Sequence, residues 1–202
     1  QRDLKRIIAY SSINHLGYCL LGIFAAATAG HTAASLSDRA AAMNGVLLQI
    51  FNHGLTAAAI FCFIGFLEKR SGGLRGLDDF GGLRAAAPVL AGLMGISIFS
   101  SLGLPGLNGF AGEFLIFKGS FALAPGVTAL AVIGLFVTAL FLLTLIQRVF
   151  TGPLNPRWAS FADLSLSERV TVVPAVALMA VVGVCPQSLI TLFNQTVLNL
   201  LR

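Results

Sequence analysis

The stretch from residue 104 to residue 118 constrains the fold more than any other part of the chain. Long apolar sequence flanks it, yet it holds the helix breakers Pro105, Gly106 and Gly109 and one carboxylate, Glu113. In hydrocarbon every backbone N–H and C=O needs a partner, so an interrupted helix persists only inside protein or beside a water-filled cavity. A charged acid at the centre of a membrane helix costs about 2.5–3.5 kcal/mol. The sequence therefore predicts a discontinuous helix and a functional acid in a hydrated interior.

Composition indicates an all-α integral membrane protein. The chain is 56% hydrophobic and 10% charged, whereas soluble domains are about 25% charged. The net charge of +5 is spread over short connections, which is typical of membrane flanks and does not support nucleic-acid binding. Cys19, Cys62 and Cys185 lie in apolar runs without paired spacing, so neither a disulfide framework nor a metal site is expected.

Apolar runs predict a polytopic helical bundle of five to six spans within a single transmembrane region, residues 1–202. A span needs about 20 apolar residues. The expected spans cover approximately residues 7–28, 43–67, 85–104, 108–123, 127–150 and 170–201. The fourth run is short, so it is either a half-span paired with the third or a separate short helix. Residues 30–39, which include His31, are expected as a loop, and residues 183–186 are expected to kink or end the last span.

Two polar stripes predict inward-facing helix surfaces. One stripe has spacings of four, three and four, and the other has spacings of four and three, which place each set on one helix face. Their members are Ser11, His15, Tyr18 and Gly22, and Gln49, His53 and Thr56. A neutral imidazole accepts at one nitrogen and donates at the other, so His15 and His53 are candidate proton relays. The alternative is that both are core histidines satisfied by neighbouring side chains or water.

Glu113 is the first candidate for a proton path, because a carboxyl group can both take up and release a proton. The alternative is a carboxylate that caps the broken helix or pairs with a neighbour. Lys5 is either an interfacial anchor or a point of ion uptake or release. The sequence shows no nucleophile paired with a base, no phosphate-binding loop and no pair of catalytic acids. We therefore expect no bond chemistry on this chain alone.

Several motifs resemble the antiporter-like membrane subunits of respiratory complex I, the NADH-quinone oxidoreductase. The resemblance covers nearly the whole chain and is carried by the stretches Asp3–Ser12, Ile13–Gly17, Asn52–Leu55, Leu104–Gly106, Gly109–Phe114 and Cys185–Gln187. Two of the three types of such subunit carry a lysine at the position of Glu113. The glutamate therefore indicates the M-type group, called chain 4 in mitochondria, and the chain resembles about its C-terminal half.

The resemblance implies part of an inverted-repeat, antiporter-like fold and a proton-translocating function. It implies that Glu113, His53 and His15 belong to a central hydrophilic axis and that Lys5 matches a recurrent basic position. NADH, FMN, iron–sulfur clusters and quinone are expected on partner subunits, with no cofactor or metal on this chain. The expected partners are other membrane subunits, the lipid bilayer, water and protons, in a bacterial inner (plasma) membrane.

Two other functions stay open at this point. Subunits of cation/proton antiporters and of membrane-bound hydrogenases share the opening motif and the broken helix. A non-transporting scaffold would use its polar residues only to satisfy helix packing.

Overall fold

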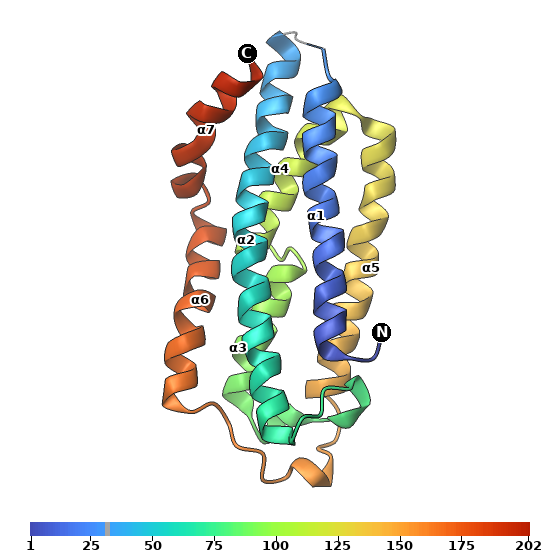
Figure 1. The fold of residues 1–202 in the computed structure, drawn as a ribbon, viewed down its shortest axis with the longest axis vertical. Coiled ribbons are helices and arrows are strands. Elements are labelled where there is room, and N and C mark those ends of the chain that lie inside the picture. The colour runs from blue at the N-terminus through green and yellow to red at the C-terminus, as the bar shows by residue number, and fades with distance from the viewer. Residues whose placement is uncertain (31–32) are drawn as a thin grey trace.

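The computed structural model describes residues 1–30 and 33–202, which form an all-helical bundle (Figure 1). His31, expected in a loop, lies outside the described residues. The α-helices are α1 (Leu4–Thr28), α2 (Ala33–Ser71), α3 (Pro88–Ser101), α4 (Asn108–Leu123), α5 (Pro125–Phe150), α6 (Leu166–Val184) and α7 (Gln187–Leu201). Short 3-10 turns are η1 (Leu77–Asp79), η2 (Leu83–Ala85) and η3 (Pro156–Trp158). The expected fold class, an all-α membrane bundle, is confirmed.

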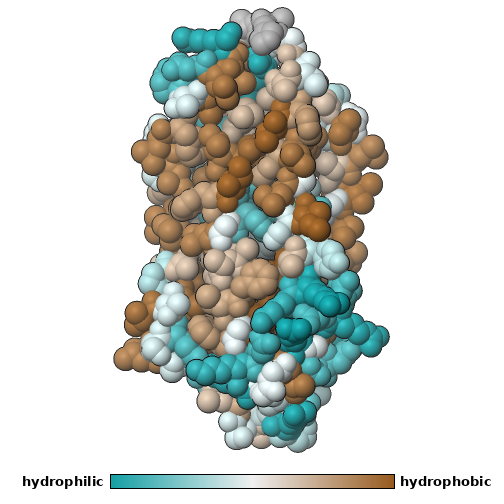
Figure 2. Space-filling model, in the orientation of Figure 1, coloured by the Kyte–Doolittle hydropathy of each residue, from teal (hydrophilic) through white to brown (hydrophobic). Residues whose placement is uncertain are grey.

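The helices make five passes along the long axis of the bundle. α1, α2, α5 and α6 are each long and apolar enough to cross a membrane. α3 and α4 are shorter, and Figure 1 shows them end to end and running in the same direction, as α6 and α7 also do. Apolar side chains cover the middle of the molecule and hydrophilic ones gather toward its two ends (Figure 2). Of the five or six spans that the sequence left open, this arrangement gives five.

The break in the third pass covers residues 102–107 and contains Pro105 and Gly106. Gly106 has φ +93°, a left-handed conformation that glycine adopts without steric cost. Gly109, expected within the break, lies instead in the first turn of α4. A Cβ at Gly109 would lie 3.1 Å from the carbonyl carbon of Ser100 and would overlap its oxygen. The absence of a side chain at Gly109 thus lets the two halves of the broken helix meet closely.

The polar stretch 30–39, expected as a loop, is helical from Ala33 onward. Arg39 explains the difference, because its side chain is buried and serves as a hydrogen-bond donor to the ends of other helices. Its Nε donates to the Ala26 carbonyl oxygen at 2.9 Å and its Nη1 to the Leu201 carbonyl oxygen at 3.2 Å. The last carbonyls of a helix lack partners within that helix, so a buried arginine stabilises both ends.

Residues next to each end of α6 explain where this helix starts and stops. Ser165 is the N-cap of α6 and forms a capping box with Glu168, which satisfies two otherwise unpaired groups. α6 ends at Val184, and α7 begins after Pro186. Proline has no backbone N–H to continue a helix. The run 170–201 is therefore two consecutive helices, and the first of them begins four positions earlier than expected.

Ion pairs and hydrogen bonds hold the start of α3 at one end of the bundle. This end, where α2 ends and α3 and α6 begin, is called the basal end. Asp163 accepts hydrogen bonds from the backbone N–H groups of Val89 and Leu90, both at 2.9 Å. Arg70, in the last turn of α2, donates to the Glu168 carboxylate and, at 3.2 Å, to the Asp163 carbonyl oxygen. An anion beside a helix N-terminus is favourable because it satisfies unpaired N–H groups and the helix dipole. The lower half of the broken helix is thus tied to α2 and α6.

The two halves of the bundle are packed differently. The main hydrophobic core fills the half that contains α3, and its large fully buried side chains include Phe63, Leu67, Leu90 and Met94. In the other half, the upper half that contains α4, glycines allow α2 and α4 to pack closely. A Cβ at Gly45, for example, would lie 2.5 Å from the Ile116 nitrogen. Small residues let membrane helices approach closely, and this contact fixes α4 against α2.

Candidate functional site

Glu113 lies in the second turn of α4, directly above the break, and its side chain is buried. Gly112 allows this position, since a Cβ there would lie 2.5 Å from Gln49 Oε1 and 3.0 Å from Gln49 Cα. The Gln49 amide nitrogen lies 3.3 Å from Glu113 Oε1 and donates to it. The carboxyl group is therefore held inside the bundle, next to the break between α3 and α4.

His15 is the direct partner of Glu113. Its Nδ1 lies 2.9 Å from Glu113 Oε1, and its Nε2 lies 3.2 Å from the hydroxyl oxygen of Ser101, the last residue of α3. Both His15 and Glu113 are more than nine-tenths buried. A neutral imidazole satisfies both contacts when Nδ1–H donates to the carboxylate and Nε2 accepts from the serine hydroxyl. The sequence-predicted His15 and Glu113 are thus brought together, although they lie 98 positions apart in the sequence.

His53 joins the same group from α2. Its ring centroid lies 5.0 Å from that of His15, and its side chain is half-buried. Both histidines and Glu113 line a cavity of about 10 Å³, close to the space that one water molecule needs. Gln49 Oε1 and Asn52 Oδ1 are buried, and within the described residues neither has a hydrogen-bond partner. Both of these residues line the cavity.

A polar cluster at the break holds the site together. The Asn52 amide donates to the Asn108 carbonyl oxygen at 2.6 Å, and the Asn108 amide donates to the Asn52 carbonyl oxygen at 3.3 Å. The hydroxyl of Ser100 donates to Asn108 Oδ1. Asn108 therefore joins the end of α3 and the start of α4 to α2. Asn108 was not among the site residues predicted from the sequence, although its position directly after a helix break was an available signal.

Glu113 also borders a second space. A crevice of about 380 Å³ lies between α4 and α5 and is lined by Gly103, Glu113, Thr128 and the phenylalanines of α4. Phe110 and Phe114 stack there, with ring centroids 5.5 Å apart. The carboxyl group thus lies between a small polar cavity and an apolar crevice.

Lys5 does not join this group. Its ammonium pairs with the Glu68 carboxylate at the basal end, and Lys5 is ten positions, or about 15 Å of helix, from His15. The neighbouring Arg75 Nε lies 2.7 Å from Asp3 Oδ2. Burial raises the pKa of the Asp3 carboxyl, but the N–H of Arg6 and the guanidinium of Arg75 outweigh it, so the pKa lies below its usual value.

The described residues contain no group of three or more His, Cys, Asp or Glu side chains that could hold a metal ion. Cys19 is buried, whereas Cys62 and Cys185 are exposed, and all three are free thiols.

Residues 1–140 match the protein family described as NADH:quinone oxidoreductase/Mrp antiporter, TM. The chain is 38% identical over 199 residues to NADH-quinone oxidoreductase subunit M of Mycobacterium tuberculosis, an alignment that covers 98% of this chain and 34% of that protein. It is 34% identical over 202 residues to subunit M of Rickettsia bellii, covering 100% of this chain and 38% of that protein. The chain spans little more than a third of these relatives' length, which is less than the half expected.

Solved structures share the fold. A chain of respiratory complex I from Thermus thermophilus with bound NADH is 28% identical, with a TM-score of 0.84 over all of this chain and 40% of that one. A chain of the Mrp complex from a Dietzia species is 19% identical, with a TM-score of 0.82 over all of this chain and 43% of that one. The second likeness concerns the fold alone.

Proposed function

This chain belongs to the NADH:quinone oxidoreductase/Mrp antiporter membrane family, and we propose that it is the part of an M-type subunit that translocates protons. The M-type identity inferred from Glu113 agrees with relatives named subunit M. The chain is an integral membrane protein, and its relatives are bacterial, which agrees with the plasma membrane as its location. One observation carries the proposal: a buried carboxyl–imidazole pair at a helix break, beside a water-sized polar cavity.

The proposed route uses Glu113, His15 and His53. His15 takes up a second proton at Nε2 and passes its Nδ1 proton to Glu113 Oε1 along the existing 2.9 Å contact, so the ring returns to its neutral form and no side chain has to rotate. A water molecule in the adjoining cavity accepts a hydrogen bond from the N–H of the His53 ring, and its two hydrogens bond Gln49 Oε1 and Asn52 Oδ1. These two oxygens support the assignment, because a buried acceptor without a partner costs about 1–3 kcal/mol.

In this proposal, the energy that drives proton translocation comes from other subunits of the complex. NADH, FMN, iron–sulfur clusters and quinone reside on partner subunits of the complex, and electron transfer there changes the charge or hydration around the His15–Glu113 pair. The partners of this chain are other membrane subunits. Lys5 remains a predicted point of proton uptake or release; its pairing with Glu68 supports a structural role at the end of α1.

Glu113→Gln in the assembled complex tests the proposal. The amide keeps the size of the side chain but cannot carry the proton, so we expect electron transfer with fewer protons pumped per electron. Ser97→Ala is the matched control, since Ser97 is buried in the same broken helix and its hydroxyl bonds only to the Leu93 carbonyl in the described structure. A Glu113→Gln complex that pumps at the wild-type ratio would contradict the proposed route.

A subunit of a cation/proton antiporter or a membrane-bound hydrogenase is the second candidate function, and the description of the matching family, which names the Mrp antiporter, supports the antiporter. Sodium-dependent transport in vesicles, without any dependence on NADH and quinone, would identify the antiporter. A non-transporting scaffold predicts that His53→Leu and Glu113→Gln together leave pumping unchanged. The M-type function predicts that this double variant stops it.

A further inference from the structure

The hydroxyl group of Ser101 lies at the ring nitrogen through which His15 takes up a proton in the proposed route. Ser101 Oγ is 3.2 Å from His15 Nε2, and Ser101 is 8% exposed. When Nδ1–H of the neutral ring donates to Glu113, the lone pair of Nε2 accepts from this hydroxyl. An incoming proton therefore reaches Nε2 either by displacing the serine hydroxyl or by passing through it.

The Ser101 hydroxyl is not bonded to its own helix. A helical serine commonly donates to the carbonyl oxygen four positions earlier, and Ser97 does so, to Leu93 at 3.1 Å. Among the described residues, His15 is the one hydrogen-bond partner of the Ser101 hydroxyl. A hydroxyl has one hydrogen to donate and two lone pairs that accept. While its hydrogen points to His15, its lone pairs are available to the cavity that Ser101 lines.

The cavity beside Ser101 has room for about one water molecule. Its volume is about 10 Å³, and its walls include both Ser101 and His53. One water in so small a space contacts both walls. A second water, which would be needed to reach Nε2 of His15 around the serine, has no space there. The serine hydroxyl is thus the available connection from the cavity to His15.

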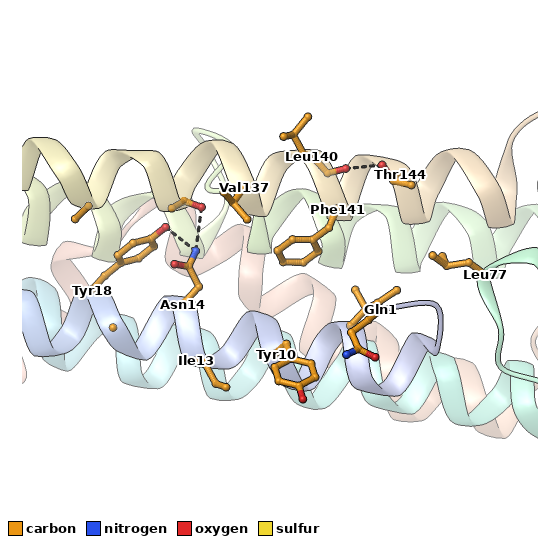
Figure 3. Close-up of a pocket in the computed structure, with 14 residues that line it drawn as sticks. Gln1, Tyr10, Ile13, Asn14, Tyr18, Leu77, Val137, Leu140, Phe141 and Thr144 are labelled. Atoms are coloured by element: carbon orange, nitrogen blue, oxygen red, sulfur yellow. Dashed lines mark hydrogen bonds between the residues drawn. The ribbon is translucent and has the colours of Figure 1, made fainter.

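Tyr18 also carries a hydroxyl on the same face of α1 as His15, but this hydroxyl is directed elsewhere. The Tyr18 ring is edge-on to that of His15, with ring centroids 6.1 Å apart. Its hydroxyl oxygen lies 2.7 Å from Asn14 Nδ2, next to α5 (Figure 3). Asn14 Nδ2 also lies 2.6 Å from Thr138 Oγ1 on α5. The Tyr18 hydroxyl therefore belongs to the contact between α1 and α5, and not to the cavity.

We propose that Ser101 is a relay residue that passes protons from the cavity water to His15, an inference that rests on the proposed function. The water carries the proton that a doubly protonated His53 ring gives up. One of its O–H bonds breaks as that hydrogen bonds covalently to Ser101 Oγ. The original serine O–H bond breaks at the same time, and its hydrogen forms the N–H bond at His15 Nε2.

All charges and hydrogens balance in this step. Water and serine end neutral, His53 has lost one proton, and His15 is an imidazolium until its Nδ1 proton passes to Glu113. Afterwards Nε2–H of His15 donates to Ser101 Oγ, whose new O–H points into the cavity. The hydrogen bonds along the relay have then reversed direction, as a hydroxyl with both donor and acceptor capacity allows.

Ser101→Thr and Ser101→Val test the relay in the full-length subunit within its complex. The two replacements have nearly the same shape and volume, but only the first keeps a hydroxyl. In vesicles, we expect Ser101→Thr to pump at the wild-type ratio of protons per electron. Ser101→Val should slow proton transfer through this subunit about 100-fold or more, because a positioned proton-transfer group is lost. Equal pumping by the two variants, whether normal or lost, would overturn the proposal.

Ser101→Ala extends the test to the case in which the added volume prevents assembly, because it removes the hydroxyl without adding atoms. Ser97→Ala is its matched control, four positions earlier on the same helix, since the Ser97 hydroxyl bonds to the Leu93 carbonyl instead. We expect Ser101→Ala to lower the number of protons pumped per electron and Ser97→Ala to leave it unchanged. Normal pumping by an assembled Ser101→Ala complex would overturn the proposal.

The infrared bands of the Glu113 carboxyl group, identified by their loss in Glu113→Gln, separate a relay from a purely structural role. Ser101→Val should leave these bands unchanged in the resting complex and abolish their change during turnover. A shift of the resting bands would show that Ser101 only holds His15 in place, and would overturn the relay. If Glu113→Gln lowers pumping and Ser101→Val does not, this inference fails and the proposed function stands. If Glu113→Gln itself pumps normally, the proposed function fails.

Discussion

Gly109→Ala tests the close contact between the two halves of the broken helix. The added Cβ would lie 3.1 Å from the Ser100 carbonyl carbon and closer to its oxygen, whereas carbon atoms in contact are normally about 3.5–4.0 Å apart. The Ser100 carbonyl belongs to the backbone and cannot rotate away, and its oxygen overlaps the added Cβ more deeply than its carbon does, so the start of α4 must move by more than about 1 Å. Such overpacking costs about 1–3 kcal/mol, against about 0.5–1 kcal/mol gained by replacing a helical glycine.

We therefore expect Gly109→Ala to lower the free energy of unfolding by about 1–2 kcal/mol. Glu113 lies one turn beyond the substitution and moves with α4. Its 2.9 Å contact with His15 would lengthen toward the limit of a hydrogen bond, about 3.2 Å or more. The assays are the Tm of the subunit in the purified complex and the number of protons pumped per electron, and both should fall.

Gly95→Ala is the control for this prediction, because Gly95 lies in the helical part of α3 and a Cβ there meets nothing within 4 Å. It should leave Tm unchanged or raise it, with normal pumping. The reasoning about the break would be refuted if Gly109→Ala behaved in the same way.

Two further substitutions address the surroundings of the site. Asn108→Ala removes the amide that joins Asn52 and Ser100. We expect it to lower the free energy of unfolding by about 2–3 kcal/mol, because buried polar groups lose their partners. A Tm within about 1 °C of the wild-type value would argue against a structural role for this cluster. Asp163→Ala removes two hydrogen bonds to the N-terminus of α3 and should cost about 1–2 kcal/mol, measured by denaturation of the solubilised subunit. Full stability of that variant would mean that α3 needs no anchor at its base.

The candidate site could be predicted largely from the sequence because its signals are local. Helical spacing places His15 and His53 on inward faces, and the break near Glu113 marks where water can be tolerated. The structure brings these three side chains into one cluster. Their role in proton transfer stays a prediction until it is measured.

Other features depend on contacts between distant parts of the chain. The number of passes was open because local sequence does not set the direction of the chain after residues 102–107. The early start of α2 depends on carbonyl groups at Ala26 and Leu201 that Arg39 reaches only in the folded bundle. The partner of Lys5, Glu68, likewise lies at the far end of another helix. Such pairings are set by tertiary packing, which periodicity alone does not specify.

The imidazole ring of His15 bridges the two halves of the interrupted helix. Its Nε2 is held by Ser101, at the end of the lower half, and its Nδ1 by Glu113, in the upper half. The two helix halves are therefore joined through hydrogen bonds to a single ring. In the proposed route, a hinge movement that separates the halves would make the ring give up one of its two partners, and we expect such a displacement to change which atom holds the proton.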